Sequence, residues 1–342
     1  MSAPASGAAA VLAALRAEPR GAVSGALLSE RLGVTRAQIW KHVEALRKRG
    51  YAIEGEPGGG YRLVAAPDRL YAEEVQRDLK TRWVGHAYDY HETTDSTNRV
   101  AFELGRRGAE HGTAVVAEAQ TAGRGRLGRA FFSPPHANLY TSIVLRPTCS
   151  IADAPTLILG AAIAVADTVA AFVDDPEAVA IKWPNDVLLH DRKTSGILME
   201  SSTEGARIAF AVLGIGVNLN VDRTAFPEDF RDGATSLSSE LGRAIDRTAF
   251  TRGLFAALEA QLDAHAQGGF EALRPRFERY FRMAGSRVAV DALSGGRIEG
   301  RARGIAANGA LEIEVESDAR PGEIVEVMAG DVTLAKRPRD GR

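Results

Sequence analysis

The sequence contains a single cysteine, Cys149, among 342 residues. One cysteine excludes an intrachain disulfide framework, and neither a C-x-x-C nor an H-E-x-x-H pattern is present to indicate a zinc site. A reducing cytoplasm is the compartment that fits this cysteine usage best.

Long uncharged apolar runs are also absent. The longest apolar run, 157–173, contains Asp167 and is flanked by further aspartates, so it predicts a largely buried helix and not a membrane span. The N-terminal stretch MSAPASGAAAVLAALRAEPR has no basic region before its apolar residues. We therefore expect a helix there and not a signal peptide.

The chain has little net charge, −2, but the charge is unevenly distributed. Residues 1–66 hold nine Lys or Arg against five Asp or Glu, a net charge of +4, which leaves −6 for the remainder. The N-terminal segment is therefore the basic part of the chain. A hydrophobic content of 45% is ordinary for globular proteins, and the length suggests two or three domains.

Two helices joined by a short turn are predicted within this basic segment. Ser24 is a helix cap and Gly33 a typical helix end, while Thr35 and Gln38 form the capping box of a second helix. The apolar residues of the second helix recur at helical spacing: Ile39, Val43 and Leu46. This pattern indicates a helix-turn-helix.

The outward face of the second helix carries side chains that can reach base edges or phosphates: Arg36, Gln38, Lys41 and His42. The stretch YAIEGEPGGGYRLV that follows predicts a strand, a turn and a strand, which would form a wing beside this helix. We therefore favour DNA binding. A helical hairpin used for protein contacts is the alternative.

From residue 82 onward, short apolar runs alternate with helical patterns. Strands are expected at 87–91, 114–119, 138–145, 179–183, 187–190, 196–200 and 208–214, and helices after Asp95, over 157–173 and over 247–282. The close spacing of the later runs favours antiparallel pairing, so we expect a mixed sheet with packed helices. Residues 287–336 contain a hairpin signal at Asn308-Gly309 and predict a small β-barrel.

The stretch GRGRLGR, 123–129, satisfies the G-x-G-x-x-G pattern of a dinucleotide-binding turn. That turn must open a long helix, and the following RAFFSPP cannot do so. Glycines that keep a loop mobile and arginines that bind carboxylate or phosphate instead indicate a loop that folds over an anionic ligand. A solvated basic loop or an RNA-binding tract remains the alternative.

A second cluster, KWPND at 182–186, places a cation, an amide and a carboxylate together at a strand end. This set of groups suits a triphosphate and its Mg²⁺. Lys193 follows Asp186 by seven residues across a tight turn, so a hairpin would bring the two together. Glycines in GIGVNLN, 214–220, allow close approach of a flat ligand, although strand glycines also mark bulges.

Six motifs occur in an order and spacing that resemble biotin protein ligases: DSTN (95–98), QTAGRGRLGR (120–129), NLYTSIVLRP (138–147), KWPNDVLL (182–189), RKTSGILME (192–200) and GIGVNLN (214–220). With the helix-turn-helix in front, the chain is similar to the bifunctional family of biotin ligases that are also biotin operon repressors. The resemblance covers roughly residues 20–337. It implies an α+β fold with a winged helix-turn-helix (1–66), a catalytic domain like that of class II synthetases (67–284) and an SH3-like β-barrel (285–342).

The resemblance also implies a two-step reaction and its residues. Biotin's carboxylate attacks the α-phosphorus of ATP, and a lysine of a biotin carboxyl carrier protein then attacks the biotinoyl-5′-AMP. The residues expected at biotin are Ser96, Thr97, Asn98, Gln120, Gly123, Arg124, Gly125, Arg126, Lys193, Gly214 and Gly216. Those expected at ATP are Arg126, Arg129, Phe131, Lys182, Asn185 and Asn218. The expected catalytic residues are Lys193, Arg124, Asp186 and Lys182, with Asp186 either binding Mg²⁺ or orienting the attacking lysine.

Two positions depart from the family pattern. Phe131 stands where many members have tryptophan, and Thr194-Ser195 replaces an apolar residue plus alanine. The resemblance further implies operator DNA as a partner and a homodimer in the cytoplasm, and it leaves open whether ligand induces the dimer. A lipoate-attaching relative and a ligand-sensing repressor without catalysis are the alternatives. The glycine-arginine loop argues against the first, and the retained Lys193, Arg124 and Asp186 argue against the second.

Overall fold

The structure is a computed structural model that describes residues 7–18, 21–56, 59–292, 296–316 and 322–334. Contacts between residues divide the chain into two units, Met1–Arg69 and Leu70–Arg342. Within the described ranges, no helix is both long and apolar enough to cross a bilayer.

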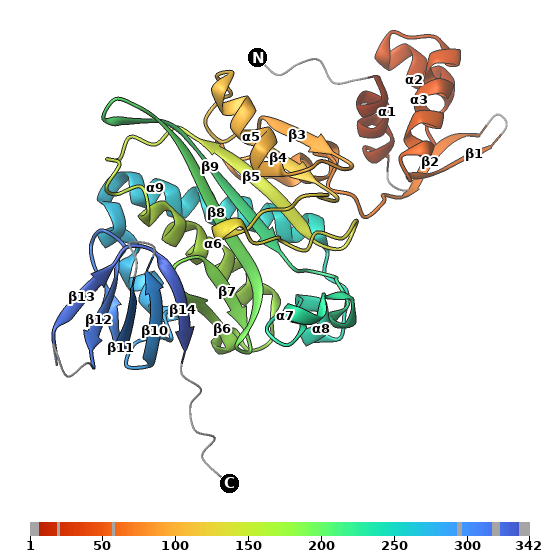
Figure 1. Cartoon of the computed structure of the whole chain (residues 1–342). Coiled ribbons are helices and arrows are strands. Elements are labelled where there is room, and N and C mark those ends of the chain that lie inside the picture. Colours follow the sequence, from red (N-terminus) through yellow and green to blue (C-terminus); the bar gives the residue numbers. More distant parts are fainter. Residues whose placement is uncertain (1–6, 19–20, 57–58, 293–295, 317–321, 335–342) are drawn as a thin grey trace. The chain divides into compact units, whose positions relative to one another are not determined.

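The N-terminal unit consists of three helices and a two-stranded antiparallel sheet (Figure 1). Its elements are α1 (Gly7–Arg16), α2 (Gly25–Leu32), α3 (Arg36–Lys48), β1 (Ala52–Glu56) and β2 (Gly60–Ala65). Ser24 caps α2, Gly33 ends it in the left-handed conformation, and the Thr35–Gln38 capping box opens α3. Both predicted helices and the strand pair of the wing are therefore confirmed.

The second unit is built on a seven-stranded mixed sheet with the order β3-β4-β5-β9-β8-β7-β6. β3 and β4 are parallel, and the other neighbouring pairs are antiparallel. The strands are β3 (Tyr88–His91), β4 (Ala114–Ala117), β5 (Leu139–Leu145), β6 (Val179–Lys182), β7 (Asp186–Leu189), β8 (Arg192–Glu204) and β9 (Arg207–Val217). The predicted mixed sheet is confirmed, and β8 and β9 are longer than expected.

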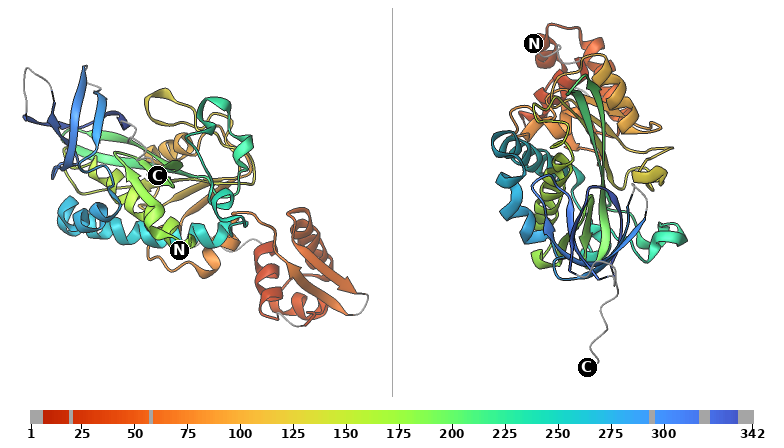
Figure 2. Two further views of the ribbon diagram at one scale, coloured as in Figure 1. Left: turned by 90° about the horizontal axis from the view of Figure 1, so that it is seen from below. Right: turned by 60° about the vertical axis from the view of Figure 1, so that its left-hand side comes forward.

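Helices cover both faces of this sheet (Figures 1 and 2). On one face, α6 (Thr156–Phe172) packs against α9 (Arg247–Tyr280), and on the other face α5 (Thr97–Arg106) contacts β5 and β9. Since strand side chains alternate between faces, Leu213 and Ile215 of β9 join the core with α6, whereas Val212 packs with α5. Gly214 and Gly216 consequently lie on the α5 face. Shorter helices are α4 (Ala72–Val75), α7 (Glu228–Arg231) and α8 (Leu237–Leu241).

A five-stranded antiparallel sheet ends the described chain, with the order β13-β12-β11-β10-β14. Its strands are β10 (Arg287–Ala292), β11 (Arg297–Ile305), β12 (Leu311–Val315), β13 (Ile324–Val327) and β14 (Gly330–Leu334). Gly309 has a φ of +86° in the turn between β11 and β12, as the Asn308-Gly309 signal predicts. The buried Trp183 donates its indole N–H to the carbonyl of Gly309 at 2.9 Å and so joins this sheet to the central one. Among the described residues, no pairing between β13 and β14 closes the sheet into a barrel.

Candidate active site

A pocket lies on the α5 face of the central sheet, and glycines form its floor. A Cβ atom on Gly214 would lie 1.9 Å from Asn98 Oδ1, and one on Gly216 would lie 2.5 Å from the Phe131 ring. Gly196 of β8 is similarly close to Lys193 and Phe131, at 3.1–3.3 Å. Any larger residue on this floor would therefore displace a side chain of the pocket wall.

A continuous chain of polar side chains forms one wall. Gln120 Oε1 accepts the backbone N–H of Thr97 at 2.9 Å, which satisfies a donor of the first turn of α5. The Ser142 hydroxyl donates to Asn98 Oδ1 at 2.6 Å, and Asn98 Nδ2 donates to Glu200 Oε2 at 2.9 Å. Asn98 and Ser142 are buried, so this wall is held in one arrangement by groups that water does not reach.

The glycine-arginine loop is folded back on itself above the pocket. Phe131 N–H donates to Gly123 O at 2.9 Å, and Gly125 N–H donates to Arg129 O at 2.7 Å. A Cβ on Gly123 would lie 2.6 Å from Phe131 O, so only glycine fits there. Between these bonds the loop contains a single helical turn, Arg126–Gly128, with Leu127 at a φ of 57°. No long helix follows, which confirms that this is not a dinucleotide-binding turn.

Two arginines tie the loop to side chains of the central sheet and its hairpins. Arg124 Nη2 donates to Glu200 Oε2 at 3.2 Å, and Arg126 Nη1 donates to Asn185 Oδ1 at 2.9 Å. Arg124 Nη2 thus contacts a carboxylate oxygen and Arg126 Nη1 an amide oxygen, and a ligand carboxylate or phosphate can compete with these groups for the two guanidinium groups.

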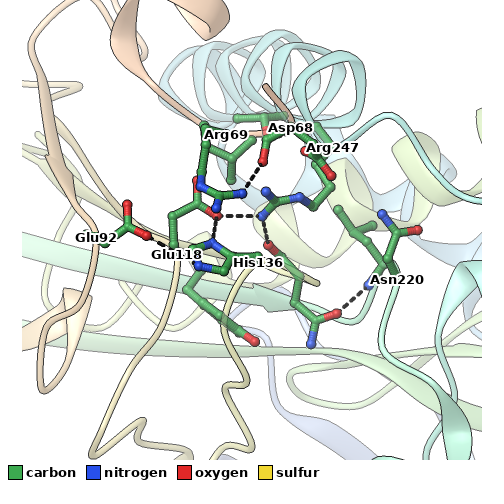
Figure 3. Close-up of polar contacts among 12 residues, drawn as sticks. Asp68, Arg69, Glu92, Glu118, His136, Asn220 and Arg247 are labelled. Carbon is green, nitrogen blue, oxygen red and sulfur yellow. Dashed lines mark hydrogen bonds and ion pairs between the residues drawn. The ribbon is translucent and has the colours of Figure 1, made fainter. Parts of the chain in front are cut away.

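The base of the same loop is fixed by a buried ion pair (Figure 3). Glu118 follows β4 and Arg247 begins α9; their side chains are fully buried, and Arg247 Nη1 lies 2.8 Å from Glu118 Oε2. The same Nη1 donates to Asn138 O at 3.1 Å, where β5 is about to begin. His136 Nδ1 lies 3.4 Å from Glu118 Oε2 and its Nε2 lies 3.3 Å from Glu92 Oε1. Both ends of the segment 118–138 are therefore anchored, and the arginine loop projects from a rigid base.

Lys193 and Asp186 meet across the β7–β8 hairpin, as the sequence predicts. Lys193 Nζ lies 2.7 Å from Asp186 Oδ1, and both side chains are partly buried. Asp186 is also the cross-strand partner of Lys182 in the β6–β7 hairpin. The ion pair holds the ammonium group at the edge of the pocket, since Lys193 lines the pocket and Asp186 supports it from behind.

Twelve of the predicted ligand residues line this one pocket: Ser96, Thr97, Asn98, Gln120, Arg124, Gly125, Arg126, Phe131, Asn185, Lys193, Gly214 and Gly216. Five do not line it: Gly123, Arg129, Lys182, Asp186 and Asn218. Asn218 is buried, and its Nδ2 donates to Thr235 O at 3.1 Å, which fixes the segment before α8. The described residues include no group of three or more His, Cys, Asp or Glu side chains able to hold a metal ion.

Sequence reasoning did not identify several pocket residues: Tyr140, Gly196, Ile197, Leu198 and Ile215, with Glu200 at the rim. Burial raises the pKa of Tyr140, so its hydroxyl stays protonated and donates to Pro134 O at 2.9 Å. Glu200 lies on the same face of β8 as Gly196 and Leu198. Because side chains alternate between the two faces of a strand, this spacing could have predicted that Glu200 is close to the pocket. The pocket has a volume of about 50 Å³, and the Phe131 ring lies over Gly216 in its floor.

The N-terminal unit presents the predicted DNA-binding face on α3. Arg36, Gln38 and Lys41 are exposed, although Gln38 Oε1 also accepts the Thr35 N–H in the capping box. His42 is only partly exposed, because its ring packs against Gly7 of α1. A Cβ atom on Gly7 would lie 2.3 Å from His42 Nε2. Sequence reasoning missed Trp40, which is 54% exposed on the same helix.

Known proteins are similar to this sequence over most or nearly all of its length. It is 36% identical to the bifunctional ligase/repressor BirA of Bacillus subtilis, over 91% of this chain and 94% of that protein. The chain belongs to the biotin protein ligase family. The BirA protein of Escherichia coli is 34% identical over 91% of this chain and 92% of its own length. The biotin--[acetyl-CoA-carboxylase] ligase of Mycobacterium tuberculosis is 33% identical over 78% of this chain and 97% of its length.

Three segments of the chain match three separate domain families. Residues 90–218 match the biotin/lipoate A/B protein ligase family, 8–62 match an HTH domain and 284–334 match the biotin protein ligase C-terminal domain. The biotin protein ligase of Aquifex aeolicus, solved with biotin and ATP, is similar with a TM-score of 0.61 and 28% identity. That likeness covers 74% of this chain and all of the other.

Proposed function

We propose that this protein joins biotin to AMP in the pocket on the α5 face and then transfers the biotinoyl group to a lysine of a biotin carboxyl carrier protein. The observation that carries the proposal is the convergence of Lys193, Arg124 and Arg126 on a pocket whose other end is the Thr97–Gln120 polar wall. One end thus offers cations for a carboxylate and a phosphate. The other offers neutral donors and acceptors for a ureido ring.

In the first step, a carboxylate oxygen of biotin bonds to the α-phosphorus of ATP, and the bond between that phosphorus and the bridging oxygen of pyrophosphate breaks. Negative charge grows on the phosphate oxygens, so positioned cations lower the barrier. Lys193 Nζ, held 2.7 Å from Asp186 Oδ1, is the cation placed for the carboxylate and α-phosphate. Arg124 and Arg126 exchange Glu200 and Asn185 for these ligand oxygens, which closes the loop over the intermediate.

In the second step, the carrier lysine's amine attacks the acyl carbon of biotinoyl-AMP, and AMP leaves with the electron pair of the broken acyl–oxygen bond. We assign the nucleotide to Phe131, Asn185, Lys182 and Arg129, and we assign Asn218 the role of fixing the wall behind them. Asp186 has Lys193 as a close partner, so we propose that Mg²⁺ would be held chiefly by the ATP phosphates and would supply positive charge for the leaving pyrophosphate.

The N-terminal unit supports a second activity, repression of transcription when the ligase holds biotinoyl-AMP. Its α3 presents Arg36, Gln38 and Lys41 beside a two-stranded wing, and residues 1–66 carry a net charge of +4. Proteins of this type read two half-sites as dimers, so we propose a homodimer on operator DNA. We also propose that it acts in the cytoplasm, a compartment that suits its single cysteine. Footprinting with and without biotin and ATP tests the repressor role.

The ligase assay is incubation with biotin, ATP, Mg²⁺ and a carboxyl carrier domain, followed by mass spectrometry of the carrier. We expect the mass of one biotinoyl group on a lysine, and none when lipoate replaces biotin. Lys193→Met removes the charge with little change of length and should abolish both pyrophosphate release and transfer. Lys80→Met, at an exposed lysine outside the pocket, is the matched control and should keep full activity. Lipoyl transfer by the wild type would contradict the substrate assignment.

A further inference from the structure

A second cavity lies in the catalytic unit, on the face of the sheet that α6 and α9 cover. Its volume is about 580 Å³, against about 50 Å³ for the active-site pocket, and the two share no lining residue. Leu145 of β5 lies in its wall and belongs to the core with α6, whereas the neighbouring Val144 packs with α5 on the active-site face. The sheet itself therefore separates the two cavities. A volume of about 300–1,000 Å³ is usual for sites that bind small organic molecules.

A break in α9 makes room for this cavity. The helix is interrupted at Gly268 and Gly269, which have φ values of −142° and 60°. A Cβ on Gly269 would meet no atom within 4 Å. The opposite wall is the segment 146–149 that follows β5, together with Leu157 in the first turns of α6. The break in α9 at Gly268 and Gly269 thus lies in the wall of the cavity.

The cavity contains a buried imidazole with one nitrogen available. His265 is 4% exposed, and its Nε2 lies 2.6 Å from Thr156 Oγ1. The Thr156 hydroxyl donates its proton to Asp153 O, so Thr156 Oγ1 accepts from Nε2, which must carry the hydrogen. Burial lowers the pKa of His265, which keeps the ring neutral. Nδ1 is then an acceptor, and no donor among the described residues binds it.

Most charged groups that line the cavity already have partners. Asp263 pairs with Arg82 and accepts the Trp83 indole N–H, and Glu271 pairs with Arg274. The guanidinium group of Arg146 donates hydrogen bonds to the carbonyl groups of Ala109, Ala209 and Gly105.

Asp153 differs from these groups. Its Oδ2 accepts from the Ser150 hydroxyl at 2.7 Å, and within the described ranges no cation pairs with it. A carboxylate and an imidazole acceptor thus face a space whose other walls include Phe270, Leu157 and Leu262. A ligand that complements these groups must supply N–H donors and positive charge at one end and an apolar body at the other.

We propose that this cavity is a second ligand site, which binds a small organic cation of the amidine or arylalkylamine class. One N–H of the ligand donates to His265 Nδ1, its positive charge faces Asp153, and its apolar body packs against Phe270 and Leu262. Binding braces the bend of α9 against the start of α6. The site is independent of the biotin reaction and does not rest on the ligase assignment.

The test uses benzamidine, with benzoate as the control of equal shape and opposite charge. Titration of the full chain is followed by NMR at the indole N–H of Trp83, which lines the cavity and donates to Asp263, while biotin and ATP are present at saturation. We expect benzamidine to shift this signal with a Kd of about 1 mM or tighter and benzoate to have no effect. Because biotin and ATP fill the first pocket, a response here reports the second.

Two variants locate the contacts. His265→Gln keeps a donor where Nε2 lies and removes the Nδ1 acceptor, and Asp153→Asn removes the charge at nearly constant volume. Each should weaken benzamidine at least about tenfold, as expected for the loss of a charge-assisted or buried hydrogen bond. Circular dichroism establishes that each is folded, and Asp153→Asn serves if His265→Gln does not fold. No shift with benzamidine, an equal shift with benzoate, or unchanged affinity in the folded variants would overturn the proposal.

Discussion

Replacing Gly214 by alanine tests whether the pocket floor must be bare backbone. The new Cβ would lie 1.9 Å from Asn98 Oδ1 and 2.8 Å from Asn98 Cγ, well inside contact distance. The strand cannot retreat, because Gly214 is paired with Ser142 of β5 on one side and Leu198 of β8 on the other. Asn98 must therefore turn away.

Turning Asn98 breaks two hydrogen bonds, the one from Ser142 at 2.6 Å and the one to Glu200 at 2.9 Å. Leaving buried polar groups unpaired costs roughly 1–3 kcal/mol, so the free energy of unfolding should fall by about that amount. Because Asn98 is also part of the pocket wall, we expect biotin to bind at least about tenfold more weakly.

Isothermal titration with biotin and urea unfolding measure the two effects separately. Gly253→Ala, within α9, is the matched control. A Cβ atom there would make only an ordinary van der Waals contact, 3.5 Å from Thr168 Cγ2 of α6. We expect that control to keep the affinity for biotin and to lose no stability. Biotin binding to Gly214→Ala with the affinity of the wild type would refute the role of Gly214 and Asn98.

Three further changes have defined outcomes. Arg126→Gly removes the bond to Asn185 Oδ1 and should speed the escape of biotinoyl-AMP in a trapping assay; an unchanged escape rate would count against loop closure. Arg247→Met leaves the Glu118 carboxylate buried without its cation and should lower the free energy of unfolding by about 3–5 kcal/mol, with a smaller loss when Glu118→Gln is added. Lys41→Ala on α3 should weaken operator binding for every sequence tested and reduce the slope of log affinity against log salt by about 1; an unchanged slope would place Lys41 away from the phosphates.

Local rules predict much of the fold from the sequence. The Ser24 cap, the Gly33 end and the Thr35–Gln38 box lie where their short-range chemistry places them. The Asp186–Lys193 pair was also predictable, because a tight hairpin leaves few places for the two side chains. Such features depend on residues within one or two turns of each other.

Features that depend on distant segments were not predictable from local patterns. Phe131 lies over Gly216, and Asn218 donates to Thr235 O instead of lining the pocket. Both positions depend on how β9 packs against other loops. The bond from Trp183 to Gly309 likewise joins residues far apart in the chain. Glu200 was missed because its partners, Asn98 and Arg124, come from other elements.

The structure of the protein bound to a sulfamoyl analogue of biotinoyl-AMP tests the central claim most directly. We expect Phe131 to leave the floor above Gly216, Arg124 and Arg126 to contact the acyl-sulfamoyl group that replaces the acyl phosphate, and Lys193 Nζ to lie within hydrogen-bond distance of it. An analogue seated in the pocket with Lys193 turned away and the 123–129 loop still bonded to Glu200 and Asn185 would contradict this account.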